Sequence, residues 1–346
     1  MGVFNENLYF CGKIKAMLDH LHIQNYRLFK DLKIDKLGQV NLIAGKNNTG
    51  KTALLEALRI LESDGNVTVI NDIVLSRGDL QVGNDMVTYD TLFYEKRSNI
   101  QIRINLILIE KEQFHELQAP SMMSTSQKDV GIKQLLGRLE FKYIYKVKSG
   151  NELDTYKNSE NPLDKAIFIS ISTEGKSNSK FWDNISLTPR EDNLVEILKI
   201  IDRRIKKVRL DNDKPKILLE NEEYPIPLKN FGDGANRLFT IALALVNAKD
   251  KVLLIDEFEV GLHHSVQEQL WEVIFKYAKE WNIQVFVTTH SQDTVKAFYY
   301  VSSKEEYKGM GQYMRLQPSR STGEIEAVIY TEDSLETAFD LNLETR

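Results

Sequence analysis

Residues 40–53 read Val40-Asn41-Leu42-Ile43-Ala44-Gly45-Lys46-Asn47-Asn48-Thr49-Gly50-Lys51-Thr52-Ala53, and this stretch decides the fold. Its second part matches the P-loop pattern G-x-x-x-x-G-K-[ST], whose glycine-rich turn presents backbone N–H groups to phosphate oxygens. The pattern predicts that Lys51 reaches the outer phosphates and that the Thr52 hydroxyl ligates Mg²⁺. An apolar strand comes before the loop, and apolar residues at helical spacing follow over 53–61. We therefore expect Gly45 to Ala53 to bind a nucleotide, assisted by the partial positive charge of a helix N-terminus.

Three further motifs follow. They are Phe231-Gly232-Asp233-Gly234, then Val252-Leu253-Leu254-Ile255-Asp256-Glu257, then Thr288-Thr289-His290-Ser291. Asp256 ends an apolar run, where a carboxylate at the edge of a buried strand would reach Mg²⁺ through water. Glu257 projects to the other side of that strand, which suits a general base that orients the attacking water. His290 ends the next strand, where an imidazole can contact the γ-phosphate. Alone, such residues are typical of solvated strand ends or structural histidines; their order behind a P-loop favours catalytic roles.

The motif around Gly232, Asp233 and Gly234 predicts a second anion-binding helix start, because two glycines come directly before a helical pattern. The alternative interpretation is a simple helix-initiating turn. One chain contains one P-loop and one such start, so two copies would pair head-to-tail with two ATP molecules between them. We expect Arg237 to add positive charge at that interface.

Composition is that of an ordinary globular protein. The 346 residues are 42% apolar and 27% charged, and the net charge of −5 gives no global basic footprint for nucleic acid. No run of 18 apolar residues occurs, so we expect no membrane span. The single cysteine, Cys11, suits a reducing cytoplasm. Residues 6–12 resemble a tobacco-etch-virus protease site with Cys in place of Gln, and we expect residues 1–16 to be an expression tag or disordered leader before a natural start at Met17.

Hydrophobic periodicity predicts an α/β fold in three parts. Residues 17–84 form a first half with the P-loop, 85–192 a β-rich insert and 193–346 a second half. Strands are expected at 20–29, 32–37, 86–94, 100–109, 139–147, 166–171, 216–219, 252–255, 284–288, 313–316 and 326–330. Helices are expected at 193–209, 237–247, 266–279 and 333–341.

Through these motifs the chain resembles the ABC-type ATPases of the SMC and RecF class. More narrowly it resembles the overcoming-lysogenization-defect (OLD) family and related bacterial defence ATPases. The strings that carry the resemblance are Ile23-Gln24-Asn25-Tyr26-Arg27-Leu28-Phe29, the P-loop, residues 231–237, and Ile255-Asp256-Glu257-Phe258-Glu259-Val260-Gly261-Leu262-His263. The resemblance implies a P-loop ABC-ATPase head with a mixed sheet, an N-terminal antiparallel β subdomain and a β-rich plus helical insert. It also implies ATP and Mg²⁺ as cofactors, and a dimer-contacting D-loop after Glu257.

The chain departs from that family pattern in its signature motif. Gly232 stands where the signature serine would be and Ala235 where its glutamine would be. The missing hydroxyl implies slow hydrolysis or a different cap for the γ-phosphate. The glutamine of the family's Q-loop is not assigned; Gln81 is the nearest candidate.

The spacing of the motifs along the chain distinguishes between the possible biological roles of this ATPase. Lys51 and Asp256 lie 205 positions apart without sustained heptads, which argues against an SMC-type coiled coil. Only 56 residues follow His290, too few for the TOPRIM nuclease that OLD proteins carry. We therefore expect a cytoplasmic ATPase, a homodimer or higher even oligomer, that controls a separate effector such as a TOPRIM-like nuclease in antiviral defence. Alternatives are a transporter's nucleotide-binding subunit, an ATP-loaded scaffold, or a DNA-associated repair ATPase. The densest basic run, residues 203–209, would contact DNA or form a solvated face.

Overall fold

The computed structural model describes residues 17–63, 65–78, 90–92, 94, 165–171, 178–331 and 334–335, and the backbone of strands between 101 and 154. The expectations for residues 1–16, Cys11 included, lie outside the described residues. So do those for Gln81 and for most of residues 333–341. No described helix combines the length and the apolar character that a bilayer crossing requires.

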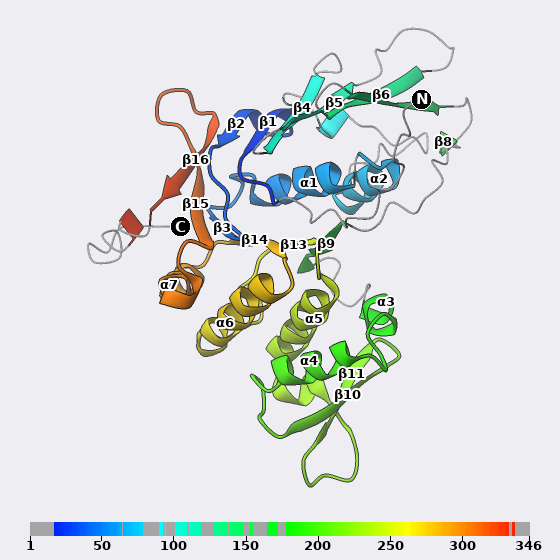
Figure 1. Cartoon of the computed structure of the whole chain (residues 1–346), viewed down its shortest axis with the longest axis vertical. Helices are drawn as coiled ribbons and strands as arrows, with labels where there is room; N and C mark the ends of the chain where they lie inside the picture. Colours follow the sequence, from blue (N-terminus) through cyan, green and yellow to red (C-terminus); the bar gives the residue numbers. More distant parts are fainter. Residues whose placement is uncertain are drawn as a thin grey trace, which may run out of the picture.

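A six-stranded sheet forms the centre of the molecule (Figure 1). Its order is β16 (Ile325–Tyr330), β15 (Gly311–Pro318), β3 (Val40–Ala44), β14 (Gln284–Thr289), β13 (Val252–Ile255) and β9 (Ala166–Ile169). All neighbours pair in parallel except β15 and β16. Every residue of β3, β13 and β14 is buried, as is usual for parallel strands covered on both faces. The strands predicted around the nucleotide motifs are confirmed.

Antiparallel strands form a second sheet in the order β2-β1-β4-β5-β6-β7-β8. The strands are β1 (Leu21–Tyr26), β2 (Phe29–Ile34), β4 (Gln101–Leu108), β5 (Lys111–Gln118), β6 (Lys128–Leu136), β7 (Leu139–Val147) and β8 (Leu153–Asp154). β1 pairs with β4, so the N-terminal strands and the insert strands share one sheet rather than two separate units. β2 begins three residues earlier than predicted, because Arg27, with φ of 50°, turns the chain and aligns Tyr26 with Phe29. Within the predicted strand 86–94, Asp90–Leu92 is a 3₁₀ helix, η1.

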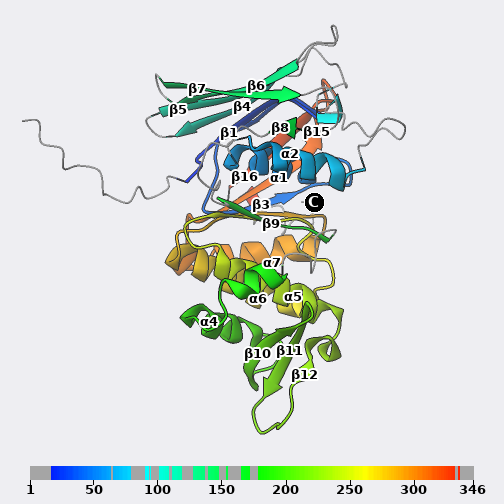
Figure 2. The ribbon, with the colours of Figure 1, turned by 90° about the vertical axis from the view of Figure 1, so that its right-hand side faces the viewer.

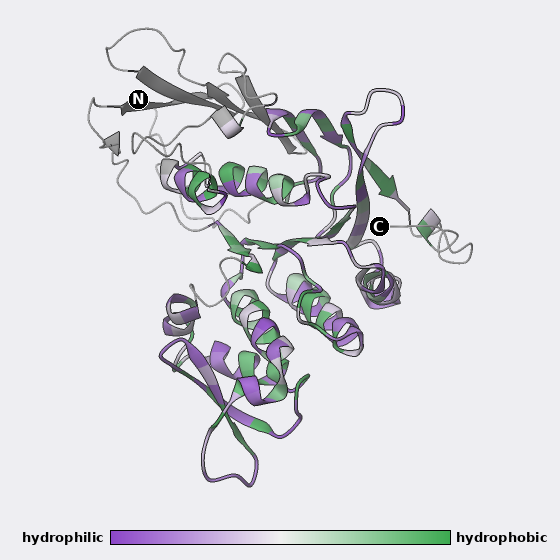
Figure 3. Ribbon diagram, turned by 180° about the vertical axis from the view of Figure 1, so that it is seen from behind, coloured by the Kyte–Doolittle hydropathy of each residue, from purple (hydrophilic) through white to green (hydrophobic). Residues whose placement is uncertain are grey.

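Helices cover both faces of the central sheet (Figure 2). Helices α1 (Lys51–Glu62) and α2 (Val67–Ser76) lie between the two sheets, and α5 (Asp233–Asn247), α6 (His264–Glu280) and α7 (Gln292–Ser302) cover the opposite face. Alternate strand residues serve the two cores: Leu254 and Phe286 pack with α1, whereas Leu253 and Val287 pack with α5 and α6. The central strands are accordingly green in Figure 3.

A small lobe extends beyond α5. It contains α3 (Asn178–Asp183), α4 (Pro189–Leu198), β10 (Ile205–Asp211), β11 (Lys214–Leu219), β12 (Ile226–Pro227) and the 3₁₀ helix η4 (Leu228–Phe231). The predicted helix 193–209 is wrong beyond residue 198, and its start is too late. Thr188 caps α4 and Pro189 occupies its first turn. Asn212 and Asp213, with φ of 49° and 61°, form a tight hairpin turn that makes the basic run a strand instead.

Candidate nucleotide site

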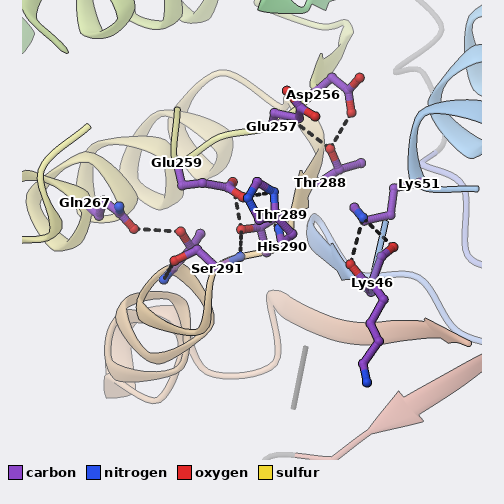
Figure 4. A network of polar contacts seen from close by, with 12 residues as sticks. Lys46, Lys51, Asp256, Glu257, Glu259, Gln267, Thr288, Thr289, His290 and Ser291 are labelled. Carbon is purple, nitrogen blue, oxygen red and sulfur yellow. Dashed lines mark hydrogen bonds and ion pairs between the residues drawn. The ribbon is translucent and has the colours of Figure 1, made fainter. Parts of the chain in front are cut away.

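The P-loop connects β3 to α1 at the centre of the sheet. Gly50 is the N-cap of α1, with φ of 95° and no capping side chain, so the first N–H groups of the helix are open to an anion. The Lys51 ammonium donates to the carbonyls of Gly45 at 2.7 Å and Lys46 at 2.9 Å (Figure 4). A Cβ at Gly45 would lie 2.6 Å from the Thr49 hydroxyl, so the loop requires glycine there. We call this loop the cradle: it combines the open helix start with the Lys51 ammonium, and both favour an anion.

Lys51 is buried, with 9% of its surface exposed. Burial lowers the pKa of its ammonium below the usual value, and the carboxylates of Glu259, Asp256 and Glu257 act in the opposite direction. Burial separates the Lys51 ammonium from water. An anionic ligand in the cradle would therefore stabilise its positive charge.

Three oxygen-bearing side chains converge beside the cradle. The Thr52 hydroxyl donates to Asp256 Oδ2 at 2.8 Å, and the Thr288 hydroxyl donates to Asp256 Oδ1 at 2.5 Å. Hydroxyl and carboxylate oxygens are ligands that Mg²⁺ accepts, and Mg²⁺ commonly takes one or two protein ligands together with substrate phosphates. Among the described residues no group of three or more His, Cys, Asp or Glu side chains could hold a metal alone. The donor set therefore fits a metal bound together with a nucleotide.

Glu257 has an unusual backbone for its residue type, with φ of 52°. Its N–H donates to the Thr288 hydroxyl at 2.9 Å, and its carbonyl accepts from Arg237 at 3.1 Å. The next N–H, of Phe258, donates to the Thr288 carbonyl at 3.0 Å. Glu257 and Asp256 thus emerge from adjacent positions of one strand end that is tied to β14 (Figure 4).

His290 lies next to Glu259, a residue that sequence reasoning did not place in the site. Glu259 Oε1 accepts from the His290 N–H at 2.7 Å and lies 2.7 Å from its Nδ1. Glu259 Oε2 accepts from the Thr289 hydroxyl at 2.8 Å. The Glu259 side chain is 9% exposed, whereas that of His290 is 48% exposed. The only signal in the sequence was a third acidic residue two positions after Glu257.

The signature-like turn lies at the start of α5. Gly232 is its N-cap, with φ of 96° and no capping side chain, and the Asp233 side chain is 88% exposed. A Cβ at Gly234 would lie 2.1 Å from the Gly261 carbonyl oxygen, so α5 packs directly on the D-loop, residues 258–263 of the same chain. Arg237 is 1% exposed and donates to the Asp256 carbonyl at 2.7 Å. The expected interface role of Arg237 is therefore corrected. Its guanidinium is buried behind the end of β13, which together with Asp256 and Glu257 is called the Walker B strand below.

These parts together define the class of protein. A parallel sheet with a P-loop after one central strand, acidic residues after another and a histidine after a third, covered by a second antiparallel sheet, is the architecture of a P-loop ATPase head. The chain belongs to the family described as "AAA domain, putative AbiEii toxin, Type IV TA system", whose model matches residues 40–295.

Individual proteins agree with this assignment. An ATP/GTP phosphatase of Helicobacter pylori is 24% identical over 338 residues, covering 84% of this chain and 90% of that protein. A DNA replication and repair protein RecF of Lactobacillus acidophilus is 52% identical over only 44 residues, 13% of this chain and 12% of that protein. The crystal structure of an SMC head bound to the C-winged helix domain of ScpA aligns with a TM-score of 0.57 at 12% identity, covering 93% of this chain and 99% of that one. The chain is an ATPase with an SMC-like head fold.

Proposed function

We propose that two copies of the chain pair head-to-tail around two ATP molecules, and that this closure controls a separate effector in bacterial anti-phage defence. The start of α5 gives the strongest support. It is a second helix N-terminus that no side chain caps, and its residues Gly232 and Asp233 are exposed. Each chain therefore offers one phosphate cradle and one open helix start that can cap the γ-phosphate of ATP bound to another copy.

The residues of the cradle divide the chemistry among them. Lys51 pairs with the β- and γ-phosphates, and Glu257 orients and deprotonates the attacking water. His290, half-exposed and held by Glu259, contacts the γ-phosphate and responds to its loss. Mg²⁺ held by Thr52 and Asp256 would neutralise phosphate charge. Hydrolysis is slow, because the cap lacks the signature serine hydroxyl.

The rate of ATP hydrolysis as a function of protein concentration tests the two-copy site. If two chains form each site, the rate per chain rises with concentration and levels off once dimers dominate. A Gly232→Glu variant puts a carboxylate where the partner's γ-phosphate would lie, and should lower the plateau without weakening ATP binding to the monomer. A rate per chain that is constant over a thousandfold dilution would contradict the proposal.

The defence role rests on the resemblance to OLD proteins and on the toxin named in the description of the matched family. The SMC head that aligns with this chain binds a partner domain, which supports a head that holds a second protein. Plaque counts on bacteria carrying the intact natural locus, with the wild type or Lys51→Ala, test this role. Protection that requires Lys51 supports it, and equal plaque counts for both would contradict it.

A second function, contact with DNA, is favoured by the hairpin of β10 and β11. Its outward residues include Lys206, Lys207 and Arg209 on β10 and Lys214 at the start of β11, all exposed. Asp211 offsets part of this charge, because it pairs with Arg209 at 3.5 Å as well as with Lys216 at 2.7 Å. A two-stranded ribbon with this charge fits the DNA backbone and the major groove. The hairpin lies at the end of the molecule opposite the antiparallel sheet (Figures 1 and 2).

Salt dependence of DNA affinity tests the hairpin. Neutralising Lys206, Lys207 and Arg209 together should lower the magnitude of the slope of log affinity against log salt, by about 0.9 for each DNA phosphate that the hairpin no longer neutralises. A matched variant neutralises the exposed Lys33, Lys36 and Lys249 elsewhere on the surface. Equal slopes for the two variants would remove the hairpin from DNA binding.

A further inference from the structure

We propose that Arg237 is a positioning residue: its buried guanidinium fixes the backbone of Asp256 and Glu257 in the conformation that hydrolysis needs, and links that backbone to α5. The inference rests on the proposed role of Glu257 as general base. Arg237 donates to the carbonyls of Asp256 and Glu257, so it acts through the backbone at the Walker B strand end.

The guanidinium bridges two consecutive carbonyls. One terminal nitrogen donates to the Asp256 carbonyl at 2.7 Å and to the Glu257 carbonyl at 3.1 Å. Arg237 is 1% exposed, and a buried cation persists only where hydrogen bonds replace its water. These carbonyls belong to the two residues that the site uses for the metal and for the water. Both bonds come from the same terminal nitrogen, Nη2, which carries two hydrogens and so can serve both carbonyls.

The backbone that Arg237 holds is strained. Glu257 has φ of 52°, a left-handed conformation that non-glycine residues adopt rarely. Such a conformation persists when the surroundings determine it from several sides, and it occurs most often at functional sites. Here the Glu257 N–H is held by the Thr288 hydroxyl at 2.9 Å and its carbonyl by Arg237. Phe258 anchors the next position, with its ring buried and stacked on Trp271 at 4.6 Å.

The same arginine belongs to the helix that offers the open start. Gly234, three residues before Arg237, approaches the Gly261 carbonyl so closely that a Cβ would lie 2.1 Å from it. A Cβ at Gly261 would lie 3.8 Å from the Arg237 Cβ. The first turns of α5 are therefore fixed to the Walker B end and to the D-loop together. In the proposed dimer, contact of α5 with one ATP is transmitted through Arg237 to the Glu257 that serves the other.

The rate of ATP hydrolysis by Arg237→Gln, in the wild-type and the Glu257→Gln backgrounds, tests this inference. If Arg237 acts through Glu257, kcat falls about tenfold or more, while KM and the Kd for ATP change less than about threefold. In the Glu257→Gln background, where steady-state turnover is lost, the residual rate is measured in a single turnover with enzyme in excess over ATP. Arg237→Gln should no longer lower that rate, because there is no carboxylate left to position. Arg237→Lys keeps the buried cation, folds even if Arg237→Gln does not, and should show the same effect at smaller size.

A matched control separates positioning from plain stabilisation. Asn247 lies on the same helix, is 5% exposed, and donates to the carbonyls of Phe181 and Leu243 away from the site. Asn247→Ala should lower the melting temperature without lowering kcat at temperatures where the protein is folded. The inference is overturned if Arg237→Gln behaves like Asn247→Ala, or if it lowers the single-turnover rate of Glu257→Gln as much as it lowers the kcat of the wild type. If instead the wild type hydrolyses ATP and Glu257→Gln is fully active, the proposed role of Glu257 fails first.

Discussion

Helices α1 and α5 begin alike, each after a glycine with φ near 95° and without a capping side chain. Their surroundings differ. At α1 the buried Lys51 folds back over the loop, and Asp256 lies within hydrogen-bond distance of Thr52. At α5 the first turn carries the exposed Asp233 and no cation follows until Arg237, which is buried and committed to its own Walker B strand. Helix α1 therefore combines an open start with a cation and a carboxylate of the same chain, whereas α5 offers backbone N–H groups alone.

The largest expected effect concerns the complete site. Lys51→Ala should weaken ATP binding about a hundredfold, because the charge-assisted hydrogen bonds to the outer phosphates are removed. Titration of ATP by calorimetry measures this. Lys249→Ala is the control, because Lys249 is an exposed lysine outside the P-loop and its substitution should change ATP affinity little. Unchanged affinity in Lys51→Ala would show that α1 is not the nucleotide site.

A second prediction concerns α5 and compares its two glycines. Gly234→Ala should destabilise the fold by about 3 kcal/mol, because the new Cβ meets the Gly261 carbonyl. Gly232→Ala has open space around its Cβ and should cost on the order of 1 kcal/mol, from backbone strain alone. Denaturant unfolding measures both. Equal losses of stability would mean that α5 does not pack on the D-loop as described.

The smallest predicted effect concerns the link between Glu259 and His290. Glu259→Gln should lower kcat about tenfold and leave KM nearly unchanged, because an amide cannot accept from both the Thr289 hydroxyl and the His290 N–H while also holding the imidazole. Glu272→Gln, on the surface beside Lys304, serves as control. A normal kcat in Glu259→Gln, together with a strong loss of activity in His290→Ala, would show that His290 needs no positioning by Glu259.

Features that depend on consecutive residues could be predicted from the sequence, whereas contacts between residues far apart in the chain could not. The P-loop and the Walker B pair depend on consecutive residues, and the strands and helices expected beside them are confirmed. The link between Arg237 and the Asp256 carbonyl joins residues 19 positions apart, and the pairing of Ile23 with Ile104 joins the two parts of the antiparallel sheet. No local pattern encodes either contact. The exposed basic residues show no hydrophobic periodicity that would distinguish a helix from a strand. The turn at Asn212 and Asp213 therefore determines that residues 205–211 form a strand.

The two-copy site is tested most directly by the mass of Glu257→Gln in solution, measured by light scattering with ATP and Mg²⁺ and again with ADP. We expect twice the 39.9 kDa chain mass with ATP, because binding persists while turnover stops, and the single mass with ADP. Adding Gly232→Glu should prevent the doubling. A monomer in both nucleotides, with ATP demonstrably bound, would contradict a site completed by the α5 start of a second copy.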